Sequence, residues 1–187
     1  MIGEEKYRCD VSNPVIGVRV GYETNARVRY RDVPRQAIGE GWAVTFTREE
    51  LDYLRSQPLA RLATVGPGQQ PDVVTVACEY DGSMFWVGGV GASVLATRKF
   101  RNVAAGASKV ALVIDDMASF DPFVARCLRV YGDADGPIER VGMVGPGSFL
   151  RIVPRNSWSW NMAGEPAGES WYEPRRTVHR ASPSRCV

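Results

Sequence analysis

The sequence predicts a mainly β domain, in which about six antiparallel strands are joined by turns and short helices. Two observations lead to this prediction. Short segments rich in β-branched and apolar residues recur through the middle of the chain, separated by turn residues such as Gly, Pro and Asp. Helical periodicity is confined to brief stretches between them. This spacing is typical of a barrel or a sandwich.

The composition fits one globular domain in a chain of 187 residues, of which 44% are hydrophobic. A net charge of +2 is too small to indicate a nucleic-acid partner. The chain has no apolar run with the length of a transmembrane helix and no signal-peptide pattern. We therefore expect a soluble protein that neither enters a membrane nor is exported.

Cysteine and histidine usage excludes several kinds of site. The only histidine, His179, lies in a polar stretch, which nearly excludes histidine-based metal sites and catalytic triads. The cysteines are far apart and form no C-x-x-C pair, so neither a disulfide framework nor a zinc site is expected. A reducing cytoplasm is the simplest setting. The cysteines are Cys9, Cys78, Cys127 and Cys186.

The first clear element is a helix from Arg48 to about Gln57. Thr47, followed three residues later by Glu50, forms a capping-box pattern. Phe46 and Leu51 have the spacing of a hydrophobic staple, which fixes the direction in which the chain enters a helix. We expect this helix to have a structural role.

A series of strands follows the helix. Asp81-Gly82 predicts a tight hairpin between the second strand and the third. The segments 115–123 and 135–147 are expected to be loops, the second because it is rich in Gly and Pro. The strands are expected at 61–65, 73–80, 84–89, 110–114, 127–134 and 149–153.

The ends of this pattern divide the chain. Residues 1–44 show no convincing fold signal and are interpreted as an N-terminal extension. Residues 45–160 form the barrel or sandwich domain. Residues 161–187 contain several Gly and Pro residues and are interpreted as a tail rather than a packed element.

A basic helix is expected from Ser93 to Val103, directly after the Gly-rich end of a strand. Its apolar residues recur at roughly helical spacing, so one face can pack on a core. Arg98, Lys99 and Arg101 then project elsewhere and could hold a phosphate through charge-assisted hydrogen bonds. The pattern alone equally allows a solvated basic helix.

From about Phe46 to Trp160 the chain resembles a known superfamily, the flavin/deazaflavin oxidoreductases with a pyridoxamine-phosphate-oxidase-like split β-barrel. Within it, the chain is most similar to the branch that uses coenzyme F420. The order and spacing of several blocks carry this resemblance more than any one of them does. The blocks are 53–65, 70–76, 86–89, 97–103, 114–116 and 152–160.

The resemblance implies a split β-barrel that forms a homodimer, with the cofactor in a groove between two barrels. It implies that Thr97, Arg98 and Lys99 hold the cofactor phosphate. Arg61 and Arg101 are candidates for contacts with further carboxylates of coenzyme F420. Arg101 could instead simply face water, which is the favoured interpretation, and Arg61 could equally pair with Asp115 or its neighbour Asp116.

Two strands would surround the cofactor ring under this resemblance. Their backbone would offer hydrogen bonds, and their side chains would offer apolar cover. Trp160 could wall the pocket, although a buried tryptophan is more often part of a core. The strand residues so assigned are Thr75, Val76, Ala77, Gly88 and Gly89.

The function implied is hydride transfer from reduced coenzyme F420 to an electrophilic carbon of a small molecule, such as an enone or an imine. The cofactor would supply the chemistry, and the protein would supply orientation and electrostatics. No catalytic side chain is assigned. The alternatives are an FMN-dependent oxidase or reductase on the same fold, and a non-catalytic protein that binds a flavin, a deazaflavin or haem.

Overall fold

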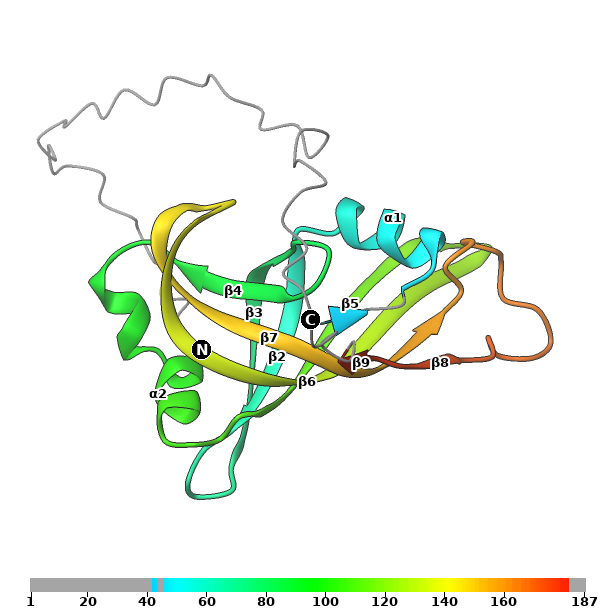
Figure 1. The fold of residues 1–187 in the computed structure, drawn as a ribbon. Helices are drawn as coiled ribbons and strands as arrows, with labels where there is room; N and C mark the ends of the chain where they lie inside the picture. The colour runs from blue at the N-terminus through cyan, green and yellow to red at the C-terminus, as the bar shows by residue number, and fades with distance from the viewer. Residues whose placement is uncertain (1–41, 44–45, 182–187) are drawn as a thin grey trace, which may run out of the picture. The chain divides into compact units, whose positions relative to one another are not determined.

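The computed structural model describes residues 42–43 and 46–181, all of which belong to one compact unit, Pro34–Val187. This unit is mostly β, as predicted, with short helices (Figure 1). The N-terminal extension expected over residues 1–44 lies outside the described residues, apart from a short strand, β1 (Trp42–Ala43). Among the described residues, no helix is long and apolar enough to span a membrane.

A closed antiparallel barrel of six strands forms the centre of the unit. Hydrogen bonding orders the strands β4–β3–β2–β5–β6–β7, and β4 returns to pair with β7. Strand β8 (Arg175–Val178) adds to β7, and β9 (Arg180–Ala181) pairs with β1. The barrel strands are β2 (Leu59–Val65), β3 (Pro71–Tyr80), β4 (Phe85–Gly89), β5 (Lys109–Phe120), β6 (Phe123–Gly142) and β7 (Gly145–Trp160).

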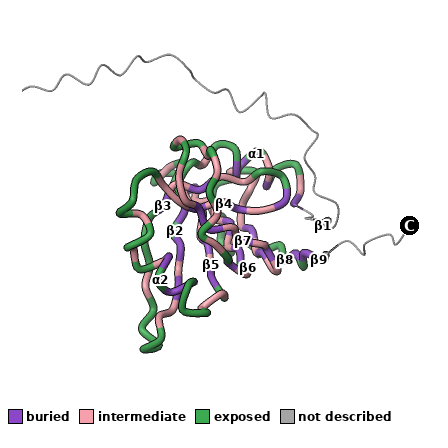
Figure 2. The backbone as a smooth tube through the Cα atoms, turned by 60° about the vertical axis from the view of Figure 1, so that its left-hand side comes forward, coloured by how far each residue is buried: buried purple, intermediate pink, exposed green. Residues whose placement is uncertain are grey.

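Buried residues occur along all of these strands (Figure 2), and their apolar members form one core inside the barrel. Leu62, Phe85, Leu112 and Leu150 are completely buried. Each such side chain stabilises the fold by about 1.5–3 kcal/mol through removal of its surface from water. Apolar residues therefore alternate along the predicted strands because every second side chain points into the same interior.

Closure of the barrel depends on a close approach of β4 and β7. An added Cβ at Gly88 would lie only 2.3 Å from the carbonyl oxygen of Ser148 and 2.7 Å from the Cα of Phe149. A Cβ at Gly147 would lie 2.1 Å from the carbonyl oxygen of Gly89. Because these contacts are with backbone atoms, they cannot be relieved by turning a side chain.

Helix α1 (Arg48–Ser56) has the predicted capping box, in which Thr47 and Glu50 exchange hydrogen bonds. The hydroxyl of Tyr53 donates to a carboxylate oxygen of Asp116 at 3.1 Å. The same carboxylate forms an ion pair with Arg126 on the neighbouring strand. These contacts hold α1 against the β5–β6 hairpin.

Both segments expected as loops are mostly strand. β5 continues to Phe120, and β6 pairs with β7 as far as Gly142 opposite Gly145. Pro137 lies where the β6–β7 register shifts, between Asp135 and Ile138, and such an irregularity tolerates a residue that cannot donate a hydrogen bond. Pairing with a long partner strand thus outweighs the local Gly and Pro content.

The segment after Trp160 also differs from the expected tail, because β8 pairs with β7 and His179 is buried. Glu50 is 1% exposed, and its carboxylate accepts hydrogen bonds from the hydroxyl of Ser159 and the guanidinium of Arg175. A buried carboxylate needs such partners. Arg175 comes from β8, so this segment completes the packing of α1.

Candidate functional site

The expected basic helix is two helices with a break at Thr97. A 3₁₀ helix, η2 (Ala92–Ala96), precedes α2 (Arg98–Ala104). Thr97 has an extended backbone, with φ −72° and ψ 153°, and its hydroxyl donates to the carbonyl oxygen of Val94 at 2.7 Å. Phe100 and Val103 pack into the core, as the apolar spacing predicts.

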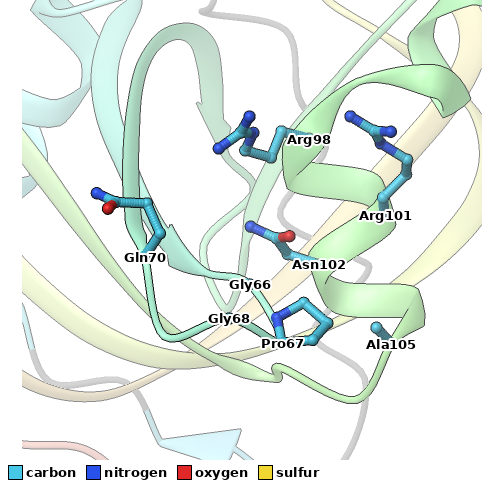
Figure 3. A pocket seen from close by; sticks show the side chains of 8 residues that line it. All are labelled: Gly66, Pro67, Gly68, Gln70, Arg98, Arg101, Asn102 and Ala105. Carbon is cyan, nitrogen blue, oxygen red and sulfur yellow. The ribbon is translucent and has the colours of Figure 1, made fainter.

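A pocket of about 420 Å³ lies between α2 and the loop that joins β2 to β3 (Figure 3). The helix contributes two arginines, and the loop contributes backbone and an amide side chain. The lining residues are Gly66, Pro67, Gly68, Gln70, Arg98, Arg101, Asn102 and Ala105.

The side chains of both arginines are exposed and can reach a ligand in the pocket. The Nε of Arg98 lies 3.8 Å from Asp72, beyond hydrogen-bond distance, and its side chain is 56% exposed. Arg101 is exposed and forms no ion pair within residues 46–181. The pocket is therefore a cationic site with donors free for an anion such as a phosphate or a carboxylate.

Lys99 does not line this pocket. Its side chain is half-buried beside the ring of Phe100, with Nζ 5.8 Å from the ring centroid. Burial lowers the pKa of Lys99, and the nearby Asp72 carboxylate partly opposes this effect. Its role as a phosphate ligand remains a prediction.

Asn102 and Gln70 are pocket residues that the sequence reasoning missed. Asn102 is buried, and its amide donates to the hydroxyl of Thr64 at 2.8 Å, which ties α2 to β2. A Cβ at Gly66 would lie 3.0 Å from the amide oxygen of Asn102, so the loop passes close to the helix. No local pattern predicts this role, because Asn102 lies off the helix face formed by Phe100 and Val103 and contacts the β2–β3 loop instead.

Strand β3 has an open edge beside this pocket. It begins directly after Gln70, and its whole first part, Pro71–Ala77, pairs with β2. Strand β4 pairs with β3 only over Cys78–Tyr80 before it joins β7. In the described part of the chain, no strand pairs with the other edge of Pro71–Ala77.

The backbone direction along β3 follows from two hydrogen bonds. The N–H of Cys78 donates to the carbonyl oxygen of Pro58, on the β2 side, whereas the N–H of Asp81 donates to Met84, on the β4 side. Successive residues of a strand point their backbone groups to opposite sides. The N–H and C=O of Thr75 and Ala77 therefore face the open edge.

The predicted ring-binding residues differ in what they expose. Thr75 is exposed and Ala77 is half-buried, whereas the side chain of Val76 lies in the core. Val76 can thus serve a ligand through neither its side chain nor its backbone, which faces β2. Gly88 and Gly89 have packing reasons of their own, since a Cβ on Gly89 would lie 2.9 Å from Val94.

Arg61 and Trp160 lie outside the pocket. Arg61 forms an ion pair with Asp115, which was one of its two predicted roles. Trp160 is half-buried at the end of β7, opposite Cys127, and its ring lies 5.3 Å from the guanidinium carbon of Arg129. Among the described residues, no group of three metal-ligating side chains occurs.

A closed antiparallel barrel of six strands, with few short helices, places the protein among the split β-barrels. No family model matches the chain. A reductase of 5a,11a-dehydrotetracycline and 5a,11a-dehydrooxytetracycline from Streptomyces rimosus is 37% identical over 124 residues, which cover 64% of this chain and 86% of the relative. The chain belongs to the family of this reductase, in the flavin/deazaflavin oxidoreductase superfamily of pyridoxamine-phosphate-oxidase-like split β-barrels.

Solved structures have the same fold at low sequence identity. A conserved hypothetical protein of Mycobacterium tuberculosis superposes with a TM-score of 0.51 at 21% identity. The match covers 68% of this chain and 93% of the mycobacterial one. The relationship to this reductase assigns the protein to the oxidoreductases of the flavin/deazaflavin superfamily.

Proposed function

We propose that this protein is a coenzyme F420-dependent reductase that delivers a hydride to an electrophilic carbon of a small conjugated molecule. The observation that carries the proposal is the pocket between α2 and the β2–β3 loop, in which Arg98 and Arg101 keep their charge available. The curated relative, a reductase of dehydrotetracyclines, supports the direction of the reaction and a conjugated acceptor.

Arg98 and Arg101 would bind the anionic part of the cofactor. A guanidinium can donate two parallel hydrogen bonds to a phosphate or a carboxylate. Gln70 and Asn102 add amide donors at the same pocket. Coenzyme F420 carries carboxylates beyond its phosphate, so the second arginine, Arg101, favours it over FMN.

The cofactor ring would lie along the open edge of β3. There the N–H and C=O groups of Thr75 and Ala77 can pair with the polar edge of a flat heterocycle. Val73, 66% exposed on the same strand, supplies apolar cover. When bound, reduced coenzyme F420 supplies the hydride; the protein fixes its orientation.

The proposal includes a homodimer. The register across the sheet aligns Val73 of β3 with Ala63, Ala111, Tyr131, Asn156 and finally Val178 of β8. Val73 and Val178 are 66% and 49% exposed, so apolar side chains lie at both ends of this row on the outer face of the barrel. In the proposed homodimer, a second copy would bury the side chains of Val73 and Val178.

Fluorescence titration of the purified protein with coenzyme F420 and with FMN tests the cofactor. We expect F420 to bind more tightly, and reduced F420 to be consumed in the presence of a conjugated enone. Binding of FMN alone would contradict the cofactor assignment. Tight F420 binding without turnover over a panel of enones, imines and quinones would indicate a carrier protein instead.

A further inference from the structure

A row of six residues, three of which are arginines, crosses the outer face of the barrel. Strand register places its members directly opposite one another on adjacent strands, so their side chains share one face of the sheet. The row consists of Thr75, Arg61, Val113, Arg129, Trp158 and Arg176, on β3, β2, β5, β6, β7 and β8 in turn.

Arg129 lies among three aromatic rings. Its guanidinium carbon is 4.6 Å from the ring centroid of Trp158, 5.2 Å from that of Tyr131 and 5.3 Å from that of Trp160. The rings of Tyr131 and Trp158 pack edge to face, with centroids 5.1 Å apart. We call these four residues the Arg129 cluster. The rings hold the guanidinium in a defined plane through cation–π contacts.

Within the described residues, the side chain of Arg129 donates no hydrogen bond. Its Nε is buried and has no hydrogen-bond partner in the described structure. No carboxylate of residues 46–181 pairs with it, whereas Arg61 in the same row is neutralised by Asp115. The buried Nε is a donor that no described protein group satisfies, and an acceptor atom on an anionic ligand would satisfy it.

The rings and the remaining charge define the ligand. Arg176, which also lacks an ion-pair partner among the described residues, lies 5.6 Å from the ring of Trp158. Tyr131 is 42% exposed, and both tryptophans are half-buried, so ring surface is available beside the cations. Aromatic surface binds flat conjugated molecules, and a guanidinium binds a carboxylate, phenolate or enolate oxygen.

We propose that the Arg129 cluster binds the hydride acceptor, a flat conjugated molecule with an anionic oxygen that Arg129 recognises. This inference rests on the proposed function and extends it to the substrate class. The row leads from Arg129 to Thr75, whose backbone faces the open edge of β3. An acceptor anchored at Arg129 would therefore extend along the row toward the cofactor.

Probe binding to the full-length protein without cofactor tests the site. The probes are anthracene-2-carboxylate and its neutral, nearly isosteric relative anthracene-2-carboxamide, followed by fluorescence anisotropy. We expect the carboxylate to bind roughly tenfold more tightly than the carboxamide, and R129Q to remove this preference. R48Q, which removes the same charge from a 92% exposed side chain, should keep it. W158L should weaken both probes alike.

Equal affinity for the two probes, or an unchanged preference in an R129Q protein with a native circular dichroism spectrum, would overturn the inference. Displacement of the carboxylate probe by coenzyme F420 in simple competition would assign the cluster to the cofactor and overturn it as well. The F420 titration is independent of these results. If F420 does not bind but the protein still prefers the carboxylate probe, the proposed function is wrong. If F420 binds but the protein shows no preference between the probes, only the proposed acceptor site is wrong.

Discussion

At the scale of single residues, ion pairing decides which arginine side chains of this barrel can bind an anionic ligand. Arg61 and Arg98 both looked like anion ligands, but Arg61 is neutralised by Asp115, whereas Arg98 approaches Asp72 only to 3.8 Å. An exposed ion pair contributes little to stability, yet it removes a guanidinium from ligand binding. The two arginines of the pocket are therefore the residues on which cofactor affinity should depend.

Replacing Arg98 with Gln should weaken cofactor binding by roughly tenfold or more, because it removes a charge-assisted hydrogen bond to an anion. The measurement is a fluorescence titration with coenzyme F420 at low salt. R48Q, on the exposed face of α1, is the matched control and should bind normally. An R98Q protein with unchanged affinity would show that the anion binds elsewhere, with Lys99 as the next candidate.

The buried His179 predicts a pH-dependent stability. Its Nε2 lies 2.9 Å from the hydroxyl of Ser157, and its Nδ1 is buried without a hydrogen-bond partner in the described structure. Burial lowers the pKa of His179 and outweighs Glu50, which acts to raise it; Arg175 lowers it further. His179 therefore takes up a proton at a lower pH in the folded protein than in the unfolded chain, where the pKa of histidine is about 6.5.

The free energy of unfolding should therefore be at its full value above about pH 6.5 and fall as the pH drops toward the lowered pKa of the folded state. Denaturant melts between about pH 7.5 and pH 5 measure this. His179 is the only histidine of the chain, so H179Q should flatten the curve over this interval. An unchanged slope in H179Q would assign the pH dependence to carboxylates instead.

At the scale of elements, one contact closes the barrel and a second fixes α1 against β8. Both join segments that are distant in sequence. The β4–β7 pair closes the sheet, and Arg175 of β8 neutralises the buried carboxylate of Glu50 on α1. The second contact explains why the region after Trp160 is ordered despite its Gly and Pro content.

G88A should destabilise the fold by about 1–3 kcal/mol, because the new methyl group would overlap backbone atoms of β7. G68A is the matched control, since a Cβ there meets no atom within 4 Å. Urea unfolding of both variants provides the comparison. A G88A protein as stable as G68A would show that the two strands can separate without cost.

At the scale of the whole molecule, the proposed homodimer depends on the exposed apolar side chains of Val73 and Val178. V73D should convert a dimer into a monomer, because it places a charge in the proposed interface. Light scattering coupled to size-exclusion chromatography measures the mass. V141D, at a position 73% exposed on the β6–β7 hairpin, is the control and should stay dimeric. A dimer that survives V73D would place the interface elsewhere.

Much of the fold could be predicted because local patterns reported it directly. The capping box of α1, the apolar strands and the Asp81-Gly82 turn are all signals within a few residues. The segments 115–123 and 135–147 were misread as loops because their strand character comes from a partner strand, and their own residues do not favour it. The same holds for β8.

The sequence by itself determined the strand pattern, the basic segment at Arg98 and the superfamily, because each depends on the identity and spacing of neighbouring residues. Only the tertiary structure decided which cations remain unpaired. It paired Arg61 with Asp115, brought Asn102 and Gln70 into the pocket and surrounded Arg129 with aromatic rings. The physical reason is that ion pairing and burial depend on distances across the sheet, between residues that are remote along the chain.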